Sequence, residues 1–132
     1  MNRTERFIRL AFENTFHSPH NFPMACVIAN GNRILSIGIN RYKSHPKQIL
    51  SFNVNRELHA EIDGIIGTRS RDLLKGATIY IARRRRGNNG PGMAKPCPVC
   101  FGLIEHMGIE KVVYTINCDG KNYDFNYEVE RV

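Results

Sequence analysis

The sequence contains no uninterrupted apolar stretch near the ~20 residues that span a bilayer, and its first residues lead into no apolar signal-peptide core. Internal repeats and low-complexity segments are also absent. These absences exclude a membrane-embedded or fibrous chain, so we expect a cytoplasmic protein without a membrane partner. With 132 residues, 42% hydrophobic and 23% charged, the composition is that of one globular domain, which we expect to cover residues 1–132.

Acidic residues and cysteines are both scarce. The 12 Asp and Glu residues stand against 19 Lys and Arg, which gives a net charge of +7. This balance favours anionic partners, either phosphorylated metabolites or nucleic acid, without choosing between them. Two of the four cysteines form a Cys-x-x-Cys pair. In a reducing compartment, such a pair indicates a metal or redox site rather than a disulfide framework.

Hydrophobic periodicity predicts helices that alternate with strands. The predicted helices run over 4–16, from 57 or 58 to 67, and over 97–107, and the predicted strands over 24–29, 33–39, 77–82 and 111–116. Asn30-Gly31 favours a hairpin between the first two strands. Asp119-Gly120 favours another hairpin before an alternating stretch at 123–129, so the last strand should return antiparallel. This order of elements is typical of an α/β layer structure with helices packed on one sheet.

Two short motifs stand at predicted helix starts: His59-Ala60-Glu61 and Pro96-Cys97-Pro98-Val99-Cys100. Cysteines three residues apart on a first helical turn project to the same side, where both sulfurs can reach one ion. With His59 they make three ligands, which leave the fourth tetrahedral position of a zinc ion (Zn2+) open for water. A second Cys-x-x-Cys is missing, because the other cysteines are the isolated Cys26 and Cys118. A closed structural zinc site is therefore disfavoured.

The residue types around this predicted zinc site favour hydrolysis. Unpaired amides and the dipole at each helix start favour thiolate over thiol and hydroxide over water. Zinc would lower the pKa of its water toward neutrality, and Glu61, which is not a ligand, can take up the proton. Passing that proton to a ring nitrogen and then to a departing amine is hydrolytic deamination. His-x-Glu with Pro-Cys-x-x-Cys is also the signature of zinc deaminases that act on nucleobases.

On these two motifs, the sequence resembles the cytidine and deoxycytidylate deaminase superfamily. The resemblance covers nearly the whole chain and implies a three-layer fold, with a central mixed five-stranded sheet and helices on both faces. It implies that His59, Cys97 and Cys100 bind the zinc ion and that Glu61 shuttles protons for an attacking zinc-bound hydroxide. It also implies that subunits associate around the site, which makes the protein a homo-oligomer.

The resemblance further implies which residues contact the substrate. The backbone amides of Ala60 and of Cys97, which follows Pro96, would lie near the substrate oxygen and the hydroxide. Asn40, at the end of the second predicted strand, resembles the asparagine that hydrogen-bonds the sugar or base. His45, in the polar loop that follows, is either a contact to the substrate phosphate or base or an exposed loop histidine.

Two features of the resemblance disagree on the substrate. A histidine as first ligand resembles the deoxycytidylate, cytosine and tRNA-adenosine branches. An antiparallel last strand resembles the branch that contains free-nucleoside enzymes and several nucleic-acid deaminases. We expect a hydrolase of nucleotide metabolism that converts cytosine to uracil in a small nucleotide or nucleoside, with deoxycytidylate favoured.

The sequence leaves three alternatives open. A deaminase of cytosine or adenine in single-stranded DNA or RNA would use the arginine run 83–86 as a backbone contact. If the substrate is small, the arginines 83–86, among them Arg83, either contact its phosphate beside the site or form a solvated strand end. A non-catalytic nucleotide- or nucleic-acid-binding module would hold a purely structural zinc ion. A thioredoxin-like redox pair would use Cys97 and Cys100 without a metal.

Overall fold

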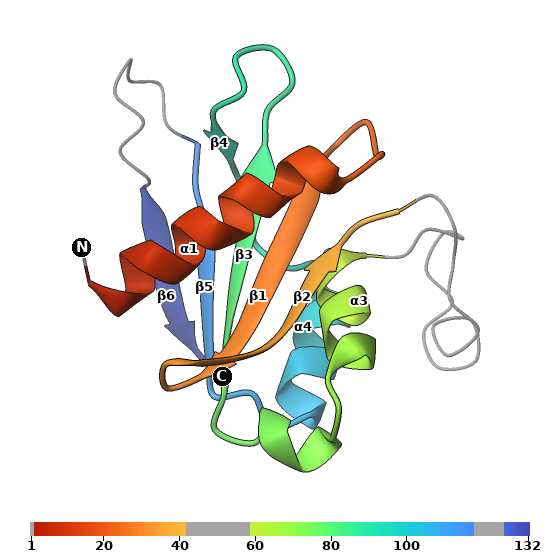
Figure 1. Ribbon diagram of the computed structural model, residues 1–132, viewed down its shortest axis with the longest axis vertical. Coiled ribbons are helices and arrows are strands. Elements are labelled where there is room, and N and C mark those ends of the chain that lie inside the picture. Colours follow the sequence, from red (N-terminus) through yellow and green to blue (C-terminus); the bar gives the residue numbers. More distant parts are fainter. Residues whose placement is uncertain (1, 42–58, 118–125) are drawn as a thin grey trace.

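The computed structural model describes residues 2–41, 59–117 and 126–132 (Figure 1). Its elements are, in chain order, α1 (Arg3–Asn14), η1 (Thr15–His17), β1 (Met24–Asn30), β2 (Arg33–Ile39), α3 (Ala60–Gly67), η2 (Arg71–Leu74), β3 (Thr78–Arg84), β4 (Pro91–Gly92), α4 (Pro98–His106), β5 (Lys111–Thr115) and β6 (Tyr127–Arg131). Among these described residues, no helix is both long and apolar enough to cross a membrane.

The strands form one mixed sheet in the order β2-β1-β3-β5-β6, and the two-residue strand β4 pairs with β3. β3 and β5 are parallel, whereas the other pairs are antiparallel. The predicted mixed sheet of five strands is confirmed, with β4 as a short addition. The antiparallel last strand is confirmed too. The Asp119-Gly120 turn predicted before it lies outside the described residues.

Alternation along the central strands gives the sheet two apolar faces. Val27 of β1 and Tyr80 of β3 belong to the cluster that α1 covers, and the Phe7 ring of α1 lies 5.2 Å from the Tyr80 ring. Their neighbours Cys26 and Ile79 belong to the cluster on the other face, with residues of α3 and α4. Figure 1 shows α1 crossing one face and α3 and α4 packed on the other. The expected three-layer arrangement is therefore confirmed.

The two helices that carry the motifs each begin directly after a motif residue. The periodicity predicts a helix from 57 or 58, but α3 begins at Ala60, because His59 has extended torsion angles (φ −72°, ψ 148°) and is its N-cap. Cys97 is likewise extended (φ −64°, ψ 162°) and caps α4, with Pro98 at the first helical position, where no N–H is needed. His59 and Cys97 therefore both stand at the open end of a helix.

The third predicted strand is longer than its local pattern indicates. β3 continues to Arg84, because Arg83 pairs with Met24 of β1 and also with the short strand β4. Arg83 and Arg84 are strand residues, and only Arg85 and Arg86 of the run follow the strand. The prediction that all four arginines follow the strand is therefore wrong. Pairing with distant segments extends the strand, and a local pattern contains no sign of it.

Gly38 allows β2 to lie directly on α3, and Gly64 of α3 allows the helix to lie close to β1. A Cβ on Gly38 would overlap backbone atoms of Ala60 and Gly64, and a Cβ on Gly64 would lie 2.6 Å from Cys26 Sγ. We expect Gly38→Ala to lower the free energy of unfolding by about 1–3 kcal/mol, because the backbone must move to admit the methyl group. Urea denaturation measures this loss.

Gly102→Ala is the matched control for this substitution. A Cβ on Gly102, inside α4, would have no atom of another segment within 4 Å. The added methyl group should therefore raise the free energy of unfolding by about 0.5–1 kcal/mol, the usual difference between alanine and glycine within a helix. A Gly38→Ala protein as stable as Gly102→Ala would contradict the close packing of β2 on α3.

Candidate metal centre

Three side chains from two helix starts converge on one point. His59 precedes α3, Cys97 precedes α4, and Cys100 lies in the first turn of α4. Their ligand atoms all lie within 4.8 Å of one another, and Cys100 Sγ is 3.3 Å from His59 Nδ1. Two motifs that are 37 residues apart in sequence, from His59 to Pro96, thus supply one cluster.

The cluster fits a zinc ion in its chemistry and its spacing. One imidazole and two thiols are donors that zinc prefers, and bonds of about 2.0–2.3 Å place tetrahedral ligand atoms roughly 3.3–3.8 Å apart. The observed limit of 4.8 Å is close to that range. Within residues 2–41, 59–117 and 126–132, no other group of three His, Cys, Asp or Glu side chains has this spacing.

The charged groups around Cys100 favour a cation at this point. Burial raises the pKa of the Cys100 thiol, and the negative charges of Glu61 and Cys97 raise it further. In such surroundings the Cys100 sulfur favours the protonated thiol over the thiolate. A bound divalent cation reverses this preference, because it stabilises the thiolate directly.

Glu61 is a buried carboxyl beside this cluster. Only 3% of the residue is exposed, and its Oε1 has no hydrogen-bond partner among the described residues. Burial raises the pKa of the carboxyl, whereas a hydrogen bond from Cys100 and the charge of His59 lower it. Glu61 does not belong to the group of three ligand atoms. A buried acceptor without a partner, next to a metal-binding cluster, indicates a functional carboxylate.

The predicted substrate contacts around the cluster are placed as follows. Ala60 is the first residue of α3 and is 1% exposed, and its carbonyl oxygen accepts a hydrogen bond from Cys26 Sγ at 3.2 Å. The amides of a first helical turn have no partner within the helix. Pro96 is buried next to Cys97. His45 lies outside the described residues, so its assignment stays a prediction.

Asn40 stands directly after β2, and most of the hydrogen-bonding capacity of its side chain is taken up within the protein. Its Oδ1 accepts hydrogen bonds from Met24 N at 2.9 Å and from Ser18 Oγ at 2.5 Å. Its Nδ2 donates to the Phe22 carbonyl oxygen at 2.8 Å. An amide nitrogen has two hydrogens, so among the described residues one donor position of Asn40 is left without a partner. Its contact with a substrate stays a prediction.

Arg83, the last predicted contact, lies on the edge of this region. Its backbone N–H donates to Thr115 Oγ1 at 3.2 Å, which ties β3 to the end of β5. Its guanidinium carbon lies 5.8 Å from the centre of the Phe22 ring. Since Phe22 is also the residue whose carbonyl holds Asn40, the structure brings Arg83 to the neighbourhood of Asn40.

Asp63 is a residue of the site region that the sequence patterns do not reveal. Its Oδ2 accepts a hydrogen bond from Ile39 N at 2.9 Å and lies 3.9 Å from an Arg41 guanidinium nitrogen. Asp63 lies in the first turn of α3, two residues after Glu61, so it fastens the end of β2 to the helix that carries the motif. Acidic residues are common in first helical turns because they interact favourably with the helix dipole. The sequence therefore gives no sign that Asp63 also binds β2.

We expect Asp63→Ala to lower the free energy of unfolding by about 1.5–3 kcal/mol, because the Ile39 N–H loses a charged acceptor. Asp63→Asn keeps an oxygen acceptor in the same place and should lose less. Chemical denaturation of the two variants compares them directly. Equal losses would mean that the ion pair with Arg41, and not the hydrogen bond, holds β2 on α3.

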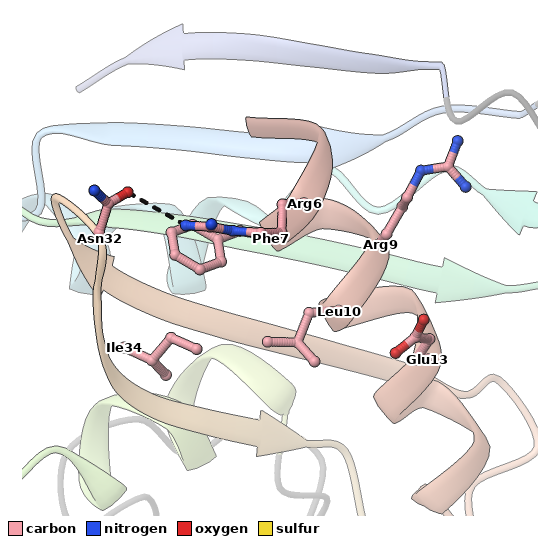
Figure 2. Close-up of a pocket in the computed structure, with 7 residues that line it drawn as sticks. All are labelled: Arg6, Phe7, Arg9, Leu10, Glu13, Asn32 and Ile34. Carbon is pink, nitrogen blue, oxygen red and sulfur yellow. Dashed lines mark hydrogen bonds between the residues drawn. The ribbon is translucent and has the colours of Figure 1, made fainter. Parts of the chain in front are cut away.

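Two hollows on the surface are separate from the cluster. One, of about 520 Å³, lies between α1 and the β1–β2 hairpin, where an Arg6 guanidinium nitrogen donates to Asn32 Oδ1 at 3.3 Å (Figure 2). The other, of about 640 Å³, borders Pro96 and α4. Neither is lined by a residue of the His59, Cys97 and Cys100 cluster.

Comparison with known proteins assigns the chain that carries this cluster to a family. A family model of the cytidine and deoxycytidylate deaminase zinc-binding region matches residues 1–116. A dCMP deaminase from the cyanophage S-TIM5 is similar in fold, with a TM-score of 0.63 and 20% identity over 92% of this chain and 90% of its own. A cytidine deaminase from Burkholderia pseudomallei has a TM-score of 0.64 and 14% identity over 99% and 93%. A search of curated protein sequences gave no significant match.

Proposed function

Since the chain belongs to the cytidine and deoxycytidylate deaminase family, we propose that it is a zinc-dependent hydrolase that converts the cytosine base of a small nucleotide, deoxycytidylate, to uracil. One observation carries this proposal. The ligand atoms of His59, Cys97 and Cys100 lie within 4.8 Å of one another, beside a buried Glu61 oxygen that has no hydrogen-bond partner in the described part of the chain.

His59, Cys97 and Cys100 would hold the zinc ion. When bound, zinc acidifies a water molecule and so supplies a nucleophile at neutral pH. The described residues supply three donors, the number that catalytic zinc sites use, whereas structural sites use four. This count supports an enzyme over a module whose zinc is structural only.

Glu61 moves the protons in the proposed reaction. Water adds its oxygen to C4 of the cytosine ring, the bond between C4 and the amino nitrogen breaks, and ammonia leaves. The Glu61 carboxylate takes one proton from the water and passes it to N3 of the ring, and it then carries the second proton to the departing amino group. Its raised pKa suits this role, because the buried carboxyl holds a proton more readily than an exposed one.

Other residues would orient the base and the sugar. The amides of Ala60 and Cys97, at the starts of α3 and α4, have no partner within their helices and would donate to oxygen atoms of the substrate. The remaining Nδ2 hydrogen of Asn40 would bond to the sugar or base. Arg83 would contact the phosphate, because its side chain lies over Phe22, next to Asn40.

Three observations support a nucleotide over a free nucleoside. The net charge of +7 favours an anionic substrate. The histidine ligand resembles the deoxycytidylate branch of the family. A second structure of the cyanophage dCMP deaminase, with a TM-score of 0.61 and 17% identity to this chain, is a complex with dCMP and dUMP.

The test is ammonia release from a panel of deoxycytidylate, cytidylate, deoxycytidine, cytidine and cytosine by the zinc-loaded protein. We expect release from deoxycytidylate and a higher kcat/KM for it than for deoxycytidine. A preference for the nucleoside would contradict the nucleotide assignment and leave the deaminase intact. If a protein that contains one zinc ion per chain releases no ammonia from any compound of the panel, the proposal of an enzyme with a small substrate is contradicted.

A further inference from the structure

Two phenylalanine rings lie on the surface between α1 and β1. Phe16 is 55% exposed and Phe22 is 61% exposed, although neither is needed to fill the core. Phe16 contacts Phe12 edge to face, with ring centres 5.9 Å apart. Exposed aromatic rings cost hydration free energy, and they gather where a partner covers them.

Arginines from the end of β3 lie against these rings. The guanidinium carbon of Arg84 is 4.4 Å from the centre of the Phe16 ring, and that of Arg83 is 5.8 Å from the Phe22 ring. An Arg86 guanidinium nitrogen donates to Asn21 Oδ1 at 3.0 Å. We call Phe16, Phe22, Arg83, Arg84 and Arg86 the Phe–Arg surface.

The backbone holds this surface in place. Met24 pairs with Arg83 in the β1–β3 ladder, and Arg84 N donates to the Pro23 carbonyl oxygen at 2.9 Å. The loop that carries the two rings therefore starts and ends on regular structure. Figure 1 shows the loop after α1 and the end of β3 at the same end of the sheet.

Among the described residues, no carboxylate pairs with the arginines of the Phe–Arg surface. Neither residues 15–24 nor residues 83–96 contain a carboxylate. None of the ion pairs found in the described residues involves Arg83, Arg84 or Arg86. Arg84 donates a hydrogen bond to Asn89 Oδ1 at 2.9 Å and Arg86 to Asn21 Oδ1, and both acceptors are neutral. The positive charge of the two arginines therefore remains to attract an anionic partner.

We propose that the Phe–Arg surface binds single-stranded nucleic acid, with bases stacked on Phe16 and Phe22 and phosphates at Arg84 and Arg86. Positive charge alone would serve any polyanion, but exposed rings serve a partner that presents flat, unpaired bases. A duplex keeps its base faces stacked inside, so it cannot use the rings. This inference goes beyond deamination of a small nucleotide, because the binding itself requires neither zinc nor Glu61.

The Phe–Arg surface adjoins Asn40, one of the predicted substrate contacts. The Phe22 carbonyl accepts from Asn40 Nδ2, and Asn40 follows Ile39, which Asp63 fastens to α3. Phe22 therefore lies next to the residue proposed to bind the sugar.

The test is fluorescence anisotropy with a labelled 20-nucleotide oligothymidylate, which contains neither cytosine nor adenine. Binding is thus measured without any chemistry, and its outcome is independent of the substrate panel. We expect the single strand to bind more tightly than a duplex of equal length. Phe16→Leu and Phe22→Leu should each weaken binding roughly tenfold, because a leucine fills the same space without a ring for stacking.

The charge contribution has a matched control. Arg84→Gln with Arg86→Gln should reduce the slope of log K against log[salt] by about 1.4, because each contact to a single-stranded phosphate contributes about 0.7. Arg69→Gln with Arg71→Gln removes the same charge from exposed positions next to η2, before the start of β3 and so at the other end of that strand. This control pair should leave the slope almost unchanged.

Four outcomes would overturn the proposal: no binding of the single strand, equal binding of the duplex, equal losses in the two arginine pairs, or no effect of either leucine substitution. A smaller oligomer in the Phe16→Leu or Phe22→Leu protein than in the wild type would also overturn the proposal. In that case the surface is an interface between copies of this chain. Circular dichroism of each variant shows that a lost signal is not caused by unfolding.

Discussion

Glu61→Gln is expected to lower kcat for deamination by about 10²–10⁴-fold, the usual contribution of a positioned proton-transfer group. Glutamine has the same shape as glutamate but takes up no proton from water at neutral pH, so the attack and the departure of the amine both lose their proton carrier. Because Glu61 does not belong to the group of ligand atoms, the variant should still bind one zinc ion per chain. Steady-state kinetics and metal analysis of the same sample measure both quantities.

Stability provides the control for this substitution. Glu61 is 3% exposed, and its Oε1 has no partner among the described residues, so the folded protein bears the cost of burying a carboxylate. The neutral amide removes that cost, and the midpoint of thermal unfolding should stay the same or rise. A variant that keeps activity within tenfold of wild type would exclude Glu61 as the proton carrier. A variant that loses its zinc would make Glu61 a ligand instead.

Cys100→Ser is expected to abolish zinc retention and activity together. Cys100 is fully buried, and its Sγ lies 3.3 Å from His59 Nδ1. A serine hydroxyl is a weak zinc ligand, so affinity should fall by more than about 100-fold, the loss that a change in the supporting residues alone can cause. Added zinc should raise the thermal midpoint of the wild-type protein but not that of the variant.

Cys26→Ser is the matched control for Cys100→Ser. Both cysteines are fully buried, but the Cys26 thiol donates to the Ala60 carbonyl oxygen at 3.2 Å, a bond that a serine hydroxyl can replace. This variant should keep one zinc ion per chain. Equal zinc loss in both variants would mean that the fold, and not the ligand set, controls metal binding.

Much of the fold could be predicted because its signals are local. A short apolar run identified β1, alternation identified β2, and β-prone residue types identified β3. Asn30-Gly31 identified the turn that joins β1 to β2. The metal cluster could be predicted because two short motifs contain all three donors, and the family resemblance brought the two motifs together. The family match and the order of the strands confirm that resemblance.

The remaining features depend on contacts between distant segments. The start of α3 is set by the extended backbone of His59, and no residue type in the motif signals that angle. The length of β3 depends on its pairing with Met24 and with β4. Asp63 fastens the end of β2 to α3 through a hydrogen bond that spans 24 residues of sequence. Such roles appear only when the segments are seen together.

The central claim is an open zinc site with three protein donors, and X-ray absorption at the zinc edge of the reduced, zinc-loaded protein tests it most directly. The account predicts two sulfur neighbours at about 2.3 Å and two nitrogen or oxygen neighbours at about 2.0–2.1 Å, because His59, Cys97 and Cys100 leave one position to water. A shell with three or four sulfurs, or a folded protein that binds no zinc, would contradict it.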